Sequence, residues 1–450
     1  MTALTAPRQS PPAPEPTRSP LLRPARTLAR YAVRHGLPAV YLARAARRGD
    51  LVGRLLRDPA VREHPYDVHE QLRARGPLVP SALGLVTTSH AVAQEVLRSD
   101  RFGVGWDRSR ASGAIGWALR FGDELDAAGV AEPPSMLVVD APDHTRYRRL
   151  VSRAFTPRAT AAFEPVIRRT AEQLLDGLAG AGTVDLVDRY AAQLPVLVIA
   201  ELLGVPTDRR EDFLCWGAAA AATLDPGLPV RRYVRAERGL RAMHGFLRQH
   251  FDRLRRDPVD DLVSRLVGLP GEEALTEREL HATVLLLLGA GFETTVNLLG
   301  NAVVALDAHP DQWEALRAEP AGWAGAVEEA LRYDSPVQLT GRTARADVEV
   351  AGRLVPAGGR VTLLLGAANR DPGVFADPAR FDVGRANARE HLAFSGGVHY
   401  CLGAGLARLE AEVALQALSE RFPRMRVAGR PVRRDLRTLR GFEVLPVSLG

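Results

Sequence analysis

The stretch Phe394-Ser395-Gly396-Gly397-Val398-His399-Tyr400-Cys401-Leu402-Gly403 carries one of only two cysteines in a chain of 450 residues. Glycines precede and follow this cysteine. Glycine lets a backbone approach a bulky group where a Cβ would collide, and the amides after Cys401 can point at its sulfur and stabilise negative charge. The pattern therefore predicts a loop that holds a thiolate against a large, flat group, for which haem iron is the candidate.

A free buried cysteine in a glycine-rich turn is the simpler alternative, but it leaves Phe394, the glycines and His399 unexplained. The stretch resembles the haem-binding loop of the cytochromes P450, whose usual form is Phe-Gly-x-Gly-x-His-x-Cys-x-Gly. Only Ser395 departs from that form, in place of the first glycine. The resemblance implies that Cys401 is the axial ligand of haem b, and that the loop residues contacting the haem are Phe394, Gly397, His399 and Gly403.

An apolar segment from about Leu275 to Leu306 predicts one helix of ~45 Å. A carboxylate and two hydroxyls interrupt its middle, in Gly289-Ala290-Gly291-Phe292-Glu293-Thr294-Thr295, and such groups are costly in an apolar helix unless they are used. Ala290 and Thr294 share a face, and Gly291 adds no bulk, so the pattern indicates a notch wide enough for dioxygen or water. The alternative is a helix kink with a threonine bonded to the backbone.

This segment is similar to the distal-helix pattern of the cytochromes P450. The resemblance implies that Thr294 holds dioxygen by a hydrogen bond, that Glu293 relays protons to it, and that Ala290 contacts the haem.

Glu329 and Arg332 lie three residues apart on a predicted helix and can pair. Such a pair is common and is usually solvated. Here it follows the threonine helix and precedes the cysteine loop, as in the cytochromes P450. The resemblance implies a buried pair joined by a second arginine from Pro378-Ala379-Arg380-Phe381, so that Arg380 completes a structural brace behind the haem.

The haem propionates need cationic partners. The segment from Asp140 to Arg149 resembles the P450 helix in which a histidine and an arginine four residues apart bind propionates. The resemblance implies the set His144, Arg148, Arg342 and His399. The remaining arginines on this helix, Arg146, Arg149 and Arg153, form a hypothetical docking site for an acidic ferredoxin.

Charge is concentrated at the start of the chain. Residues 1–60 contain eleven arginines and three acidic residues, a net charge of +8; since the whole chain carries +6, residues 61–450 carry −2. The body therefore lacks the basic character expected of a nucleic-acid-binding domain. The two cysteines, Cys215 and Cys401, exclude a disulfide framework and fit a reducing, cytoplasmic setting. We expect Cys215 to be inert packing beside Trp216.

Two parts are expected: residues 1–60, and one P450 haem domain over residues 61–450. The first twenty residues are proline-rich and predict a disordered tail. Residues 21–57 alternate arginines with apolar residues, which predicts a basic amphipathic helix. It could be a solvated leader, a segment that associates weakly with an anionic membrane or a partner, or an arginine-rich transit peptide. A membrane span is excluded by its short apolar runs.

The body is predicted to be mainly α with small β-sheets, with short strands near 83–88, 348–350 and 361–365. The resemblance implies that this is the cytochrome P450 fold. Residues 101–134 predict an adaptable loop beside a site. By resemblance, this loop, residues 214–241 and the region near Phe442 shape the substrate site. Their apolar composition predicts a bulky apolar small molecule as substrate.

The implied activity is monooxygenation, either hydroxylation or epoxidation, in secondary metabolism. No flavin or iron–sulfur motif occurs in the chain, so electrons are expected from a separate ferredoxin and its NAD(P)H-dependent ferredoxin reductase. Two alternatives stay open: P450 oxidative coupling or peroxide-driven oxidation, and a non-catalytic haem-binding protein.

Overall fold

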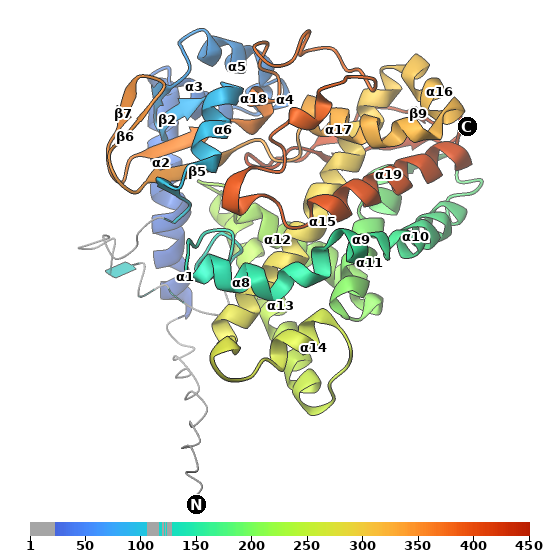
Figure 1. The fold of residues 1–450 in the computed structure, drawn as a ribbon, viewed down its shortest axis with the longest axis horizontal. Helices are drawn as coiled ribbons and strands as arrows, with labels where there is room; N and C mark the ends of the chain where they lie inside the picture. Colours follow the sequence, from blue (N-terminus) through green and yellow to red (C-terminus); the bar gives the residue numbers. More distant parts are fainter. Residues whose placement is uncertain (1–22, 106–116, 119–120, 122, 124–127) are drawn as a thin grey trace, which may run out of the picture.

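Helices dominate the computed structural model, which describes residues 23–105, 117–118, 121, 123 and 128–450 (Figure 1). The predicted fold class is confirmed. The helices are α1 Arg23–Tyr31, α2 Leu37–Arg47, α3 Leu51–Arg57, α4 Pro59–Glu63, α5 Tyr66–Arg73, α6 His90–Arg98, α8 Asp143–Ser152, α9 Pro157–Ala161, α10 Glu164–Asp176, α11 Gln193–Leu203, α12 Arg210–Ala222, α13 Val230–Arg256, α14 Leu262–Val267, α15 Glu277–Asp307, α16 Pro310–Ala318, α17 Trp323–Tyr333, α18 Leu365–Ala368 and α19 Ala404–Arg421.

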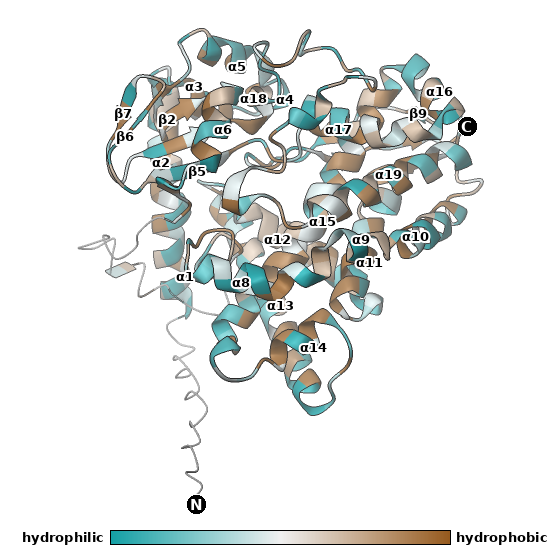
Figure 2. Ribbon diagram, in the orientation of Figure 1, coloured by the Kyte–Doolittle hydropathy of each residue, from teal (hydrophilic) through white to brown (hydrophobic). Residues whose placement is uncertain are grey.

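Helix α15 forms the centre of the molecule, and α11, α12, α17 and α19 pack around it (Figure 1). The predicted helix at 275–306 is thus confirmed with ends shifted by one or two residues. It begins with a capping box, in which the Thr276 hydroxyl accepts from the Glu279 N–H and the Glu279 carboxylate accepts from the Thr276 N–H, and this satisfies two backbone donors at the helix start. Brown, hydrophobic segments occur in most of the helices, including α14 and α18, and alternate with teal, hydrophilic ones along α19 (Figure 2).

Among the described residues, α15 is also the one helix long and apolar enough to cross a membrane, but 83% of its most apolar window is buried inside the fold. Its hydrophobicity is therefore that of a core helix.

Small sheets flank the helices. One sheet has the strand order β1-β2-β8-β5-β3, in which β8 pairs parallel with β2 and antiparallel with β5; the others are β4-β12-β9, β10-β11 and β6-β7. The strands are β1 Val79–Ser81, β2 Gly84–Thr87, β3 Phe102–Gly103, β4 Thr183–Asp185, β5 Thr340–Ala344, β6 Val348–Val350, β7 Arg353–Val355, β8 Arg360–Leu363, β9 Arg426–Val427, β10 Val432–Arg433, β11 Phe442–Val444 and β12 Pro446–Ser448. The three predicted strands are confirmed as β2, β6 and β8.

Residues 23–60 belong to the packed body, so the predicted boundary at residue 60 is wrong for this part. A π-helical turn joins α1 to α2, and within this region the Tyr31 and His35 rings pack on Tyr233 of α13 with centroids 5.4 and 5.0 Å apart. Further along, α3 contributes to a hydrophobic cluster with α5 and β2. The amphipathic helix was correctly predicted, but its inner face packs on protein. Residues 1–22 lie outside the described residues.

Two further expectations need comment. Cys215 is exposed although its neighbour Trp216 is buried, so the prediction that Cys215 is packing is wrong. Much of the predicted loop at 101–134 lies outside the described residues.

Candidate functional site

The cysteine loop is closed by a backbone hydrogen bond from the Cys401 N–H to the Phe394 carbonyl, at 3.0 Å. Gly397 has φ +64°, and a Cβ there would lie 2.2 Å from the Leu97 carbonyl oxygen. Ser395, the residue that departs from the family form, has φ +62°. A non-glycine residue in the left-handed region costs roughly 1–2 kcal/mol. The loop is therefore tightly specified, and Ser395 is a strained position within it.

The Cys401 thiol has accessible surface, but protein surrounds it closely enough for burial to raise its pKa. The Gly403 N–H and the guanidinium groups of Arg148 and Arg408 oppose this rise. Helix α19 begins at Ala404, three residues after the sulfur, and the start of a helix favours negative charge. The Gly403 N–H, the two guanidinium groups and the start of α19 therefore stabilise a negative charge on the sulfur without transferring a proton to it.

The predicted propionate ligands lie together beside this loop. The His144 and His399 rings are 4.1 Å apart, and Arg148 donates to the Tyr400 carbonyl at 2.8 Å. From β5, Arg342 donates to the Ser395 hydroxyl at 3.3 Å. The structure thus brings all four residues of the set next to the cysteine loop.

Two observations test whether these residues fit a haem dianion. Arg342 is buried and, among the residues that the structure describes, donates only to neutral oxygens of Thr340, Gly341 and Ser395; burial lowers its pKa to about 10. The buried Nε2 of His399 has no hydrogen-bond partner. A buried cation without a close carboxylate, beside an unsatisfied imidazole nitrogen, fits the carboxylates of a haem.

Asp140 organises this region, and sequence reasoning assigned it no role. Its carboxylate accepts from the Val104 and Gly105 N–H groups and pairs with Arg345 at 3.1 Å, and it lies 3.7 Å from His399 Nε2. Burial alone would raise its pKa, but the two N–H groups and Arg345 bring the pKa below its usual value. Asp140 therefore links β3, the end of β5 and the cysteine loop. Its place at the start of the predicted propionate segment, three residues before α8, was the available signal.

Helix α15 becomes accessible to solvent at the predicted notch. It is buried from Leu280 to Gly289, whereas Ala290 is exposed and Thr294 is partly accessible. The Thr294 hydroxyl donates to the Ala290 carbonyl at 3.0 Å, which leaves its oxygen free to accept. Gly291 has a different role from the one predicted. A Cβ at this position would lie 3.0 Å from Cγ1 of Ile199, so the glycine allows α11 to pack closely against α15.

Glu293 is buried and forms an ion pair with Arg434, which precedes β11. Burial raises the pKa of Glu293, and the Arg434 guanidinium opposes that rise. Arg434 also donates to the Phe442 carbonyl at 3.0 Å. Sequence reasoning missed Arg434, because nothing in its local pattern indicates a partner 141 residues away.

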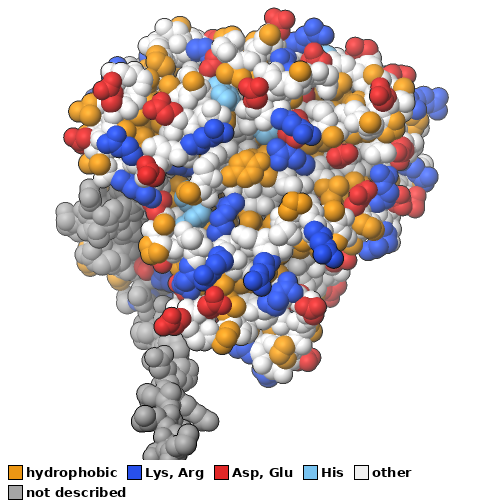
Figure 3. Space-filling view, viewed as in Figure 1, with side chains coloured by type: hydrophobic (Ala, Val, Ile, Leu, Met, Phe, Trp, Pro, Cys, Tyr) orange, Lys and Arg blue, Asp and Glu red, His pale blue; other side chains and the backbone are white. Residues whose placement is uncertain are grey.

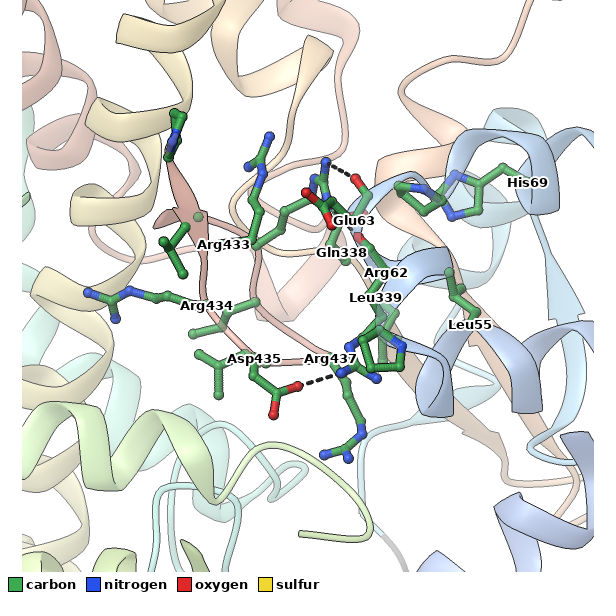
Figure 4. A pocket seen from close by; sticks show the side chains of 18 of the residues that line it. Leu55, Arg62, Glu63, His69, Gln338, Leu339, Arg433, Arg434, Asp435 and Arg437 are labelled. Atoms are coloured by element: carbon green, nitrogen blue, oxygen red, sulfur yellow. Dashed lines mark hydrogen bonds and ion pairs between the residues drawn. The ribbon is translucent and has the colours of Figure 1, made fainter. Parts of the chain in front are cut away.

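A pocket of about 530 Å³ lies next to this pair (Figure 4). It is lined by residues 430–441 on one side and by residues of α3, α4 and α5 with Gln338 and Leu339 on the other. None of the residues predicted to hold haem lines it. Arg434 lines the pocket and extends toward α15, so it connects the pocket to Glu293.

The predicted pair of Glu329 and Arg332 is confirmed as a fully buried, bidentate ion pair at 2.6 and 2.7 Å. The prediction that Arg380 joins it is wrong. The Arg380 side chain is 67% exposed and lies 3.9 Å from Asp382, whereas Arg385 is 8% exposed and lies 3.2 Å from the Glu329 carboxylate. Arg380 contributes its carbonyl, which accepts from both Arg332 and Arg385.

A second brace, from the neighbouring residue Glu328, was not predicted. Burial alone would raise the pKa of Glu328, but hydrogen bonds from His391 and Arg408 lower it to about 2. The Arg408 guanidinium lies 4.5 Å from the centroid of the Phe394 ring. Helix α17 therefore holds the segments before and after the cysteine loop through two adjacent carboxylates.

Comparison with known proteins adds independent evidence. The family model described as Cytochrome P450 matches residues 324–436. A putative cytochrome P450 140 of Mycobacterium tuberculosis is 46% identical over 430 residues, covering 94% of this chain and 97% of its own length. Vitamin D(3) 25-hydroxylase of Pseudonocardia autotrophica is 38% identical over 398 residues, covering 86% and 94%. The crystal structure of ligand-free CYP164A2 of Mycobacterium smegmatis has a TM-score of 0.79 at 41% identity, covering 88% of this chain and 99% of that one.

The brace geometry predicts opposite outcomes for two arginines close in sequence. Arg385→Gln removes a buried partner of Glu329 and should cost about 3 kcal/mol, whereas Arg380→Gln keeps the carbonyl that forms the bonds and should change stability by less than about 0.5 kcal/mol. Denaturant unfolding of the holoprotein measures both. A larger loss in the Arg380 variant would contradict the observed pairing.

Proposed function

Because the chain belongs to the cytochrome P450 family, we propose that it inserts one oxygen atom from O₂ into a bulky, apolar small molecule by hydroxylation or epoxidation. As a member of that family it is a haem-thiolate monooxygenase that carries haem b. The observation that carries the proposal is the coexistence of the Cys401 loop with the accessible Thr294 and the buried Glu293 on one core helix.

The chain's own residues divide the work between two sides. Haem b, held by Cys401, supplies the activation of dioxygen. On the cysteine side, the Gly403 N–H and the two nearby guanidinium groups of Arg148 and Arg408 stabilise the thiolate. On the other side, the Thr294 hydroxyl oxygen can accept and pass on a proton, and Glu293 can hold one because burial raises its pKa. Phe394, Gly397, Gly403 and Ala290 are proposed to contact the haem, with the propionates held by His144, Arg148, Arg342 and His399.

The proposed substrate class rests on the apolar residues that lie against α15 near the notch. Gly289 lies within 3.1 Å of the Ala220 Cβ on α12 and 3.5 Å of Val130, both measured from the position a Cβ would take. Apolar residues of two segments expected to shape the substrate site therefore approach the helix one residue before the notch. The relative from Pseudonocardia autotrophica is a hydroxylase of vitamin D(3) by its name, which supports a bulky apolar substrate and hydroxylation. A role in secondary metabolism belongs to the same proposal.

Oxidative coupling and peroxide-driven oxidation are second candidates, since they would use the same cysteine loop. The acid and the alcohol on α15 favour an O₂-driven reaction over a peroxide-driven one, because the reduction of O₂ to water consumes protons. Oxidative coupling driven by O₂ would use the same pair. A non-catalytic haem protein would have no use for this pair.

Electrons are proposed to come from a ferredoxin and its NAD(P)H-dependent reductase in the cytoplasm. Basic side chains gather over α8 and the loop before α19, around exposed hydrophobic groups (Figure 3). Val398 and Tyr400 are 72% and 39% exposed there. Of the arginines first considered, Arg146 pairs with Glu279 and is partly buried, which leaves Arg149 and Arg153 as the exposed ones.

The function is tested by turnover under ¹⁸O₂. With ferredoxin, reductase and NAD(P)H, one labelled atom should enter the product, and Thr294→Val should lower the rate about 100-fold while hydrogen peroxide is released. A Soret band at the red-shifted position of a thiolate-ligated, reduced, CO-bound haem checks the class in the same sample. Product formed only when peroxide is added would overturn the monooxygenase proposal.

Arg434 should set the pH at which Glu293 changes its protonation. Burial raises the pKa of Glu293 and Arg434 lowers it, so Arg434→Leu should raise this pKa further. The midpoint of the carboxylate-dependent limb in the pH profile of product formation should move up by about one unit. Arg434→Lys should keep the limb in place. Arg433→Leu, which removes the neighbouring arginine bound to Asp334 and Asn301, should leave it unmoved. An unchanged limb in Arg434→Leu would refute the assignment.

The docking face is tested by charge reversal. Arg149→Glu with Arg153→Glu should lower the rate of reduction by ferredoxin about tenfold at low ionic strength, and the difference should vanish at high salt. Reversal of Arg424 and Arg426, exposed at the end of the chain near β9, is the matched control. A rate and a salt dependence like those of the unmodified protein would rule this face out.

A further inference from the structure

The outward side of α2 carries a mixed apolar and basic stripe. Leu37, Val40 and Tyr41 are 55%, 55% and 57% exposed. Spacings of three and four residues continue along the helix to three exposed arginines, Arg44, Arg47 and Arg48, so all six positions lie within about 120° of the helix circumference. We call these six residues the α2 face.

The inner side of the same region is fixed to the protein. Leu42 is 1% exposed, and the Ala39 Cα lies 3.1 Å from the position that a Cβ of Gly227 would take. Thr27 donates to Glu237 of α13 at 2.9 Å, and Arg34 pairs with Glu132. The helix therefore cannot turn its exposed leucine, valine and tyrosine inward without breaking these contacts.

The region that contains the α2 face carries only positive charge. Residues 23–49 contain no aspartate or glutamate, and Arg44, Arg47 and Arg48 form no ion pair with any residue in the described part of the chain. The acids that approach from neighbouring elements, Glu132 and Glu237, are buried on the inner side. The α2 face is thus cationic and apolar at once.

Further exposed apolar groups lie near the same helical region. Trp117 is 58% exposed and stacks on Phe121 at 4.9 Å, and the Arg26 guanidinium of α1 lies 5.7 Å from the Phe121 ring centroid. Leu28 of α1 is 64% exposed. Tryptophan and tyrosine at a surface that also carries arginine are typical of groups that sit at a lipid–water boundary.

We propose that the α2 face docks on an anionic membrane surface, with α2 lying in the plane of the headgroups. Leucine, valine and tyrosine would enter the boundary of the acyl chains while the arginines bind headgroup phosphates. A second copy of this chain is a poorer occupant, because a symmetric contact through this face would bring two sets of three unpaired arginines close together. Docking would hold the adjoining segment 128–134, which reaches α15 through Val130, near the lipid, where an apolar substrate partitions.

Sedimentation of the full-length holoprotein with vesicles tests the proposal. Phosphatidylglycerol vesicles should bind it with a partition constant on the order of 10⁴ M⁻¹, and phosphatidylcholine vesicles much more weakly. The variant Arg44→Gln, Arg47→Gln, Arg48→Gln should bind anionic vesicles about 100-fold less. The variant Leu37→Ser, Val40→Ser, Tyr41→Ser should lose at least tenfold.

Matched controls are the triple Arg421→Gln, Arg424→Gln, Arg426→Gln, across the molecule from α2 (Figure 1), and Leu354→Ser, which alters a 62% exposed leucine in β7. Both should bind like the unmodified protein, and the CO-difference spectrum verifies that each variant is folded. Equal binding by all variants would overturn the proposal. So would a dimer in light scattering that the serine variant dissociates while vesicle binding is absent.

Discussion

Burial raises the pKa of the Cys401 thiol, so the negative charge of a thiolate at this position must be stabilised by neighbouring groups. The Gly403 N–H and the start of α19 contribute to this stabilisation, and both depend on the loop keeping one conformation. The loop keeps it because Gly397 lies against a carbonyl that excludes any Cβ. The adjacent carboxylates Glu328 and Glu329 then anchor the loop and its flanks to α17. The ligand's chemistry thus depends on packing in elements remote in sequence.

Several buried arginines in the described part of the chain are paired with carboxylates, and Arg342 is not. Arg332 is paired with Glu329, and Arg433 and Arg440 share the single carboxylate of Asp334, whose pKa falls below its usual value because these arginines outweigh its burial. Leaving such a charge unpaired would cost several kcal/mol. Arg342 is equally buried but donates only to neutral oxygens. Arg342 therefore has a buried guanidinium that we propose binds a carboxylate of the haem.

The predictable parts of the site were those whose signal is local. The cysteine loop, the acid and alcohol on α15, and the pair Glu329–Arg332 each occupy a few consecutive residues with fixed spacing, so their geometry follows from loop or helix periodicity. Arg385 and Arg380 lie five residues apart in irregular backbone, where no periodicity tells which side chain turns inward. Arg434 meets Glu293 across 141 residues, and only the folded chain shows that contact. The sequence left the partner of the N-terminal helix open for another reason: an amphipathic, arginine-rich pattern is the same whether its inner side meets protein or lipid.

The polar groups of α15 extend beyond the predicted pair and give the helix a second function. Glu293, Asn297 and Asn301 recur every four residues and so share one side of the helix. Glu293 binds Arg434, and Asn301 binds Arg433 and two backbone carbonyls near the ends of α17 and the 433–441 segment. Asn297, between them, packs closely against Gly441: a Cβ added at Gly441 would lie 2.0 Å from Oδ1 of Asn297. This side of α15 therefore fixes the hairpin of β10 and β11 to the helix that bears Thr294. The position of Glu293 and the shape of that hairpin thus cannot vary independently.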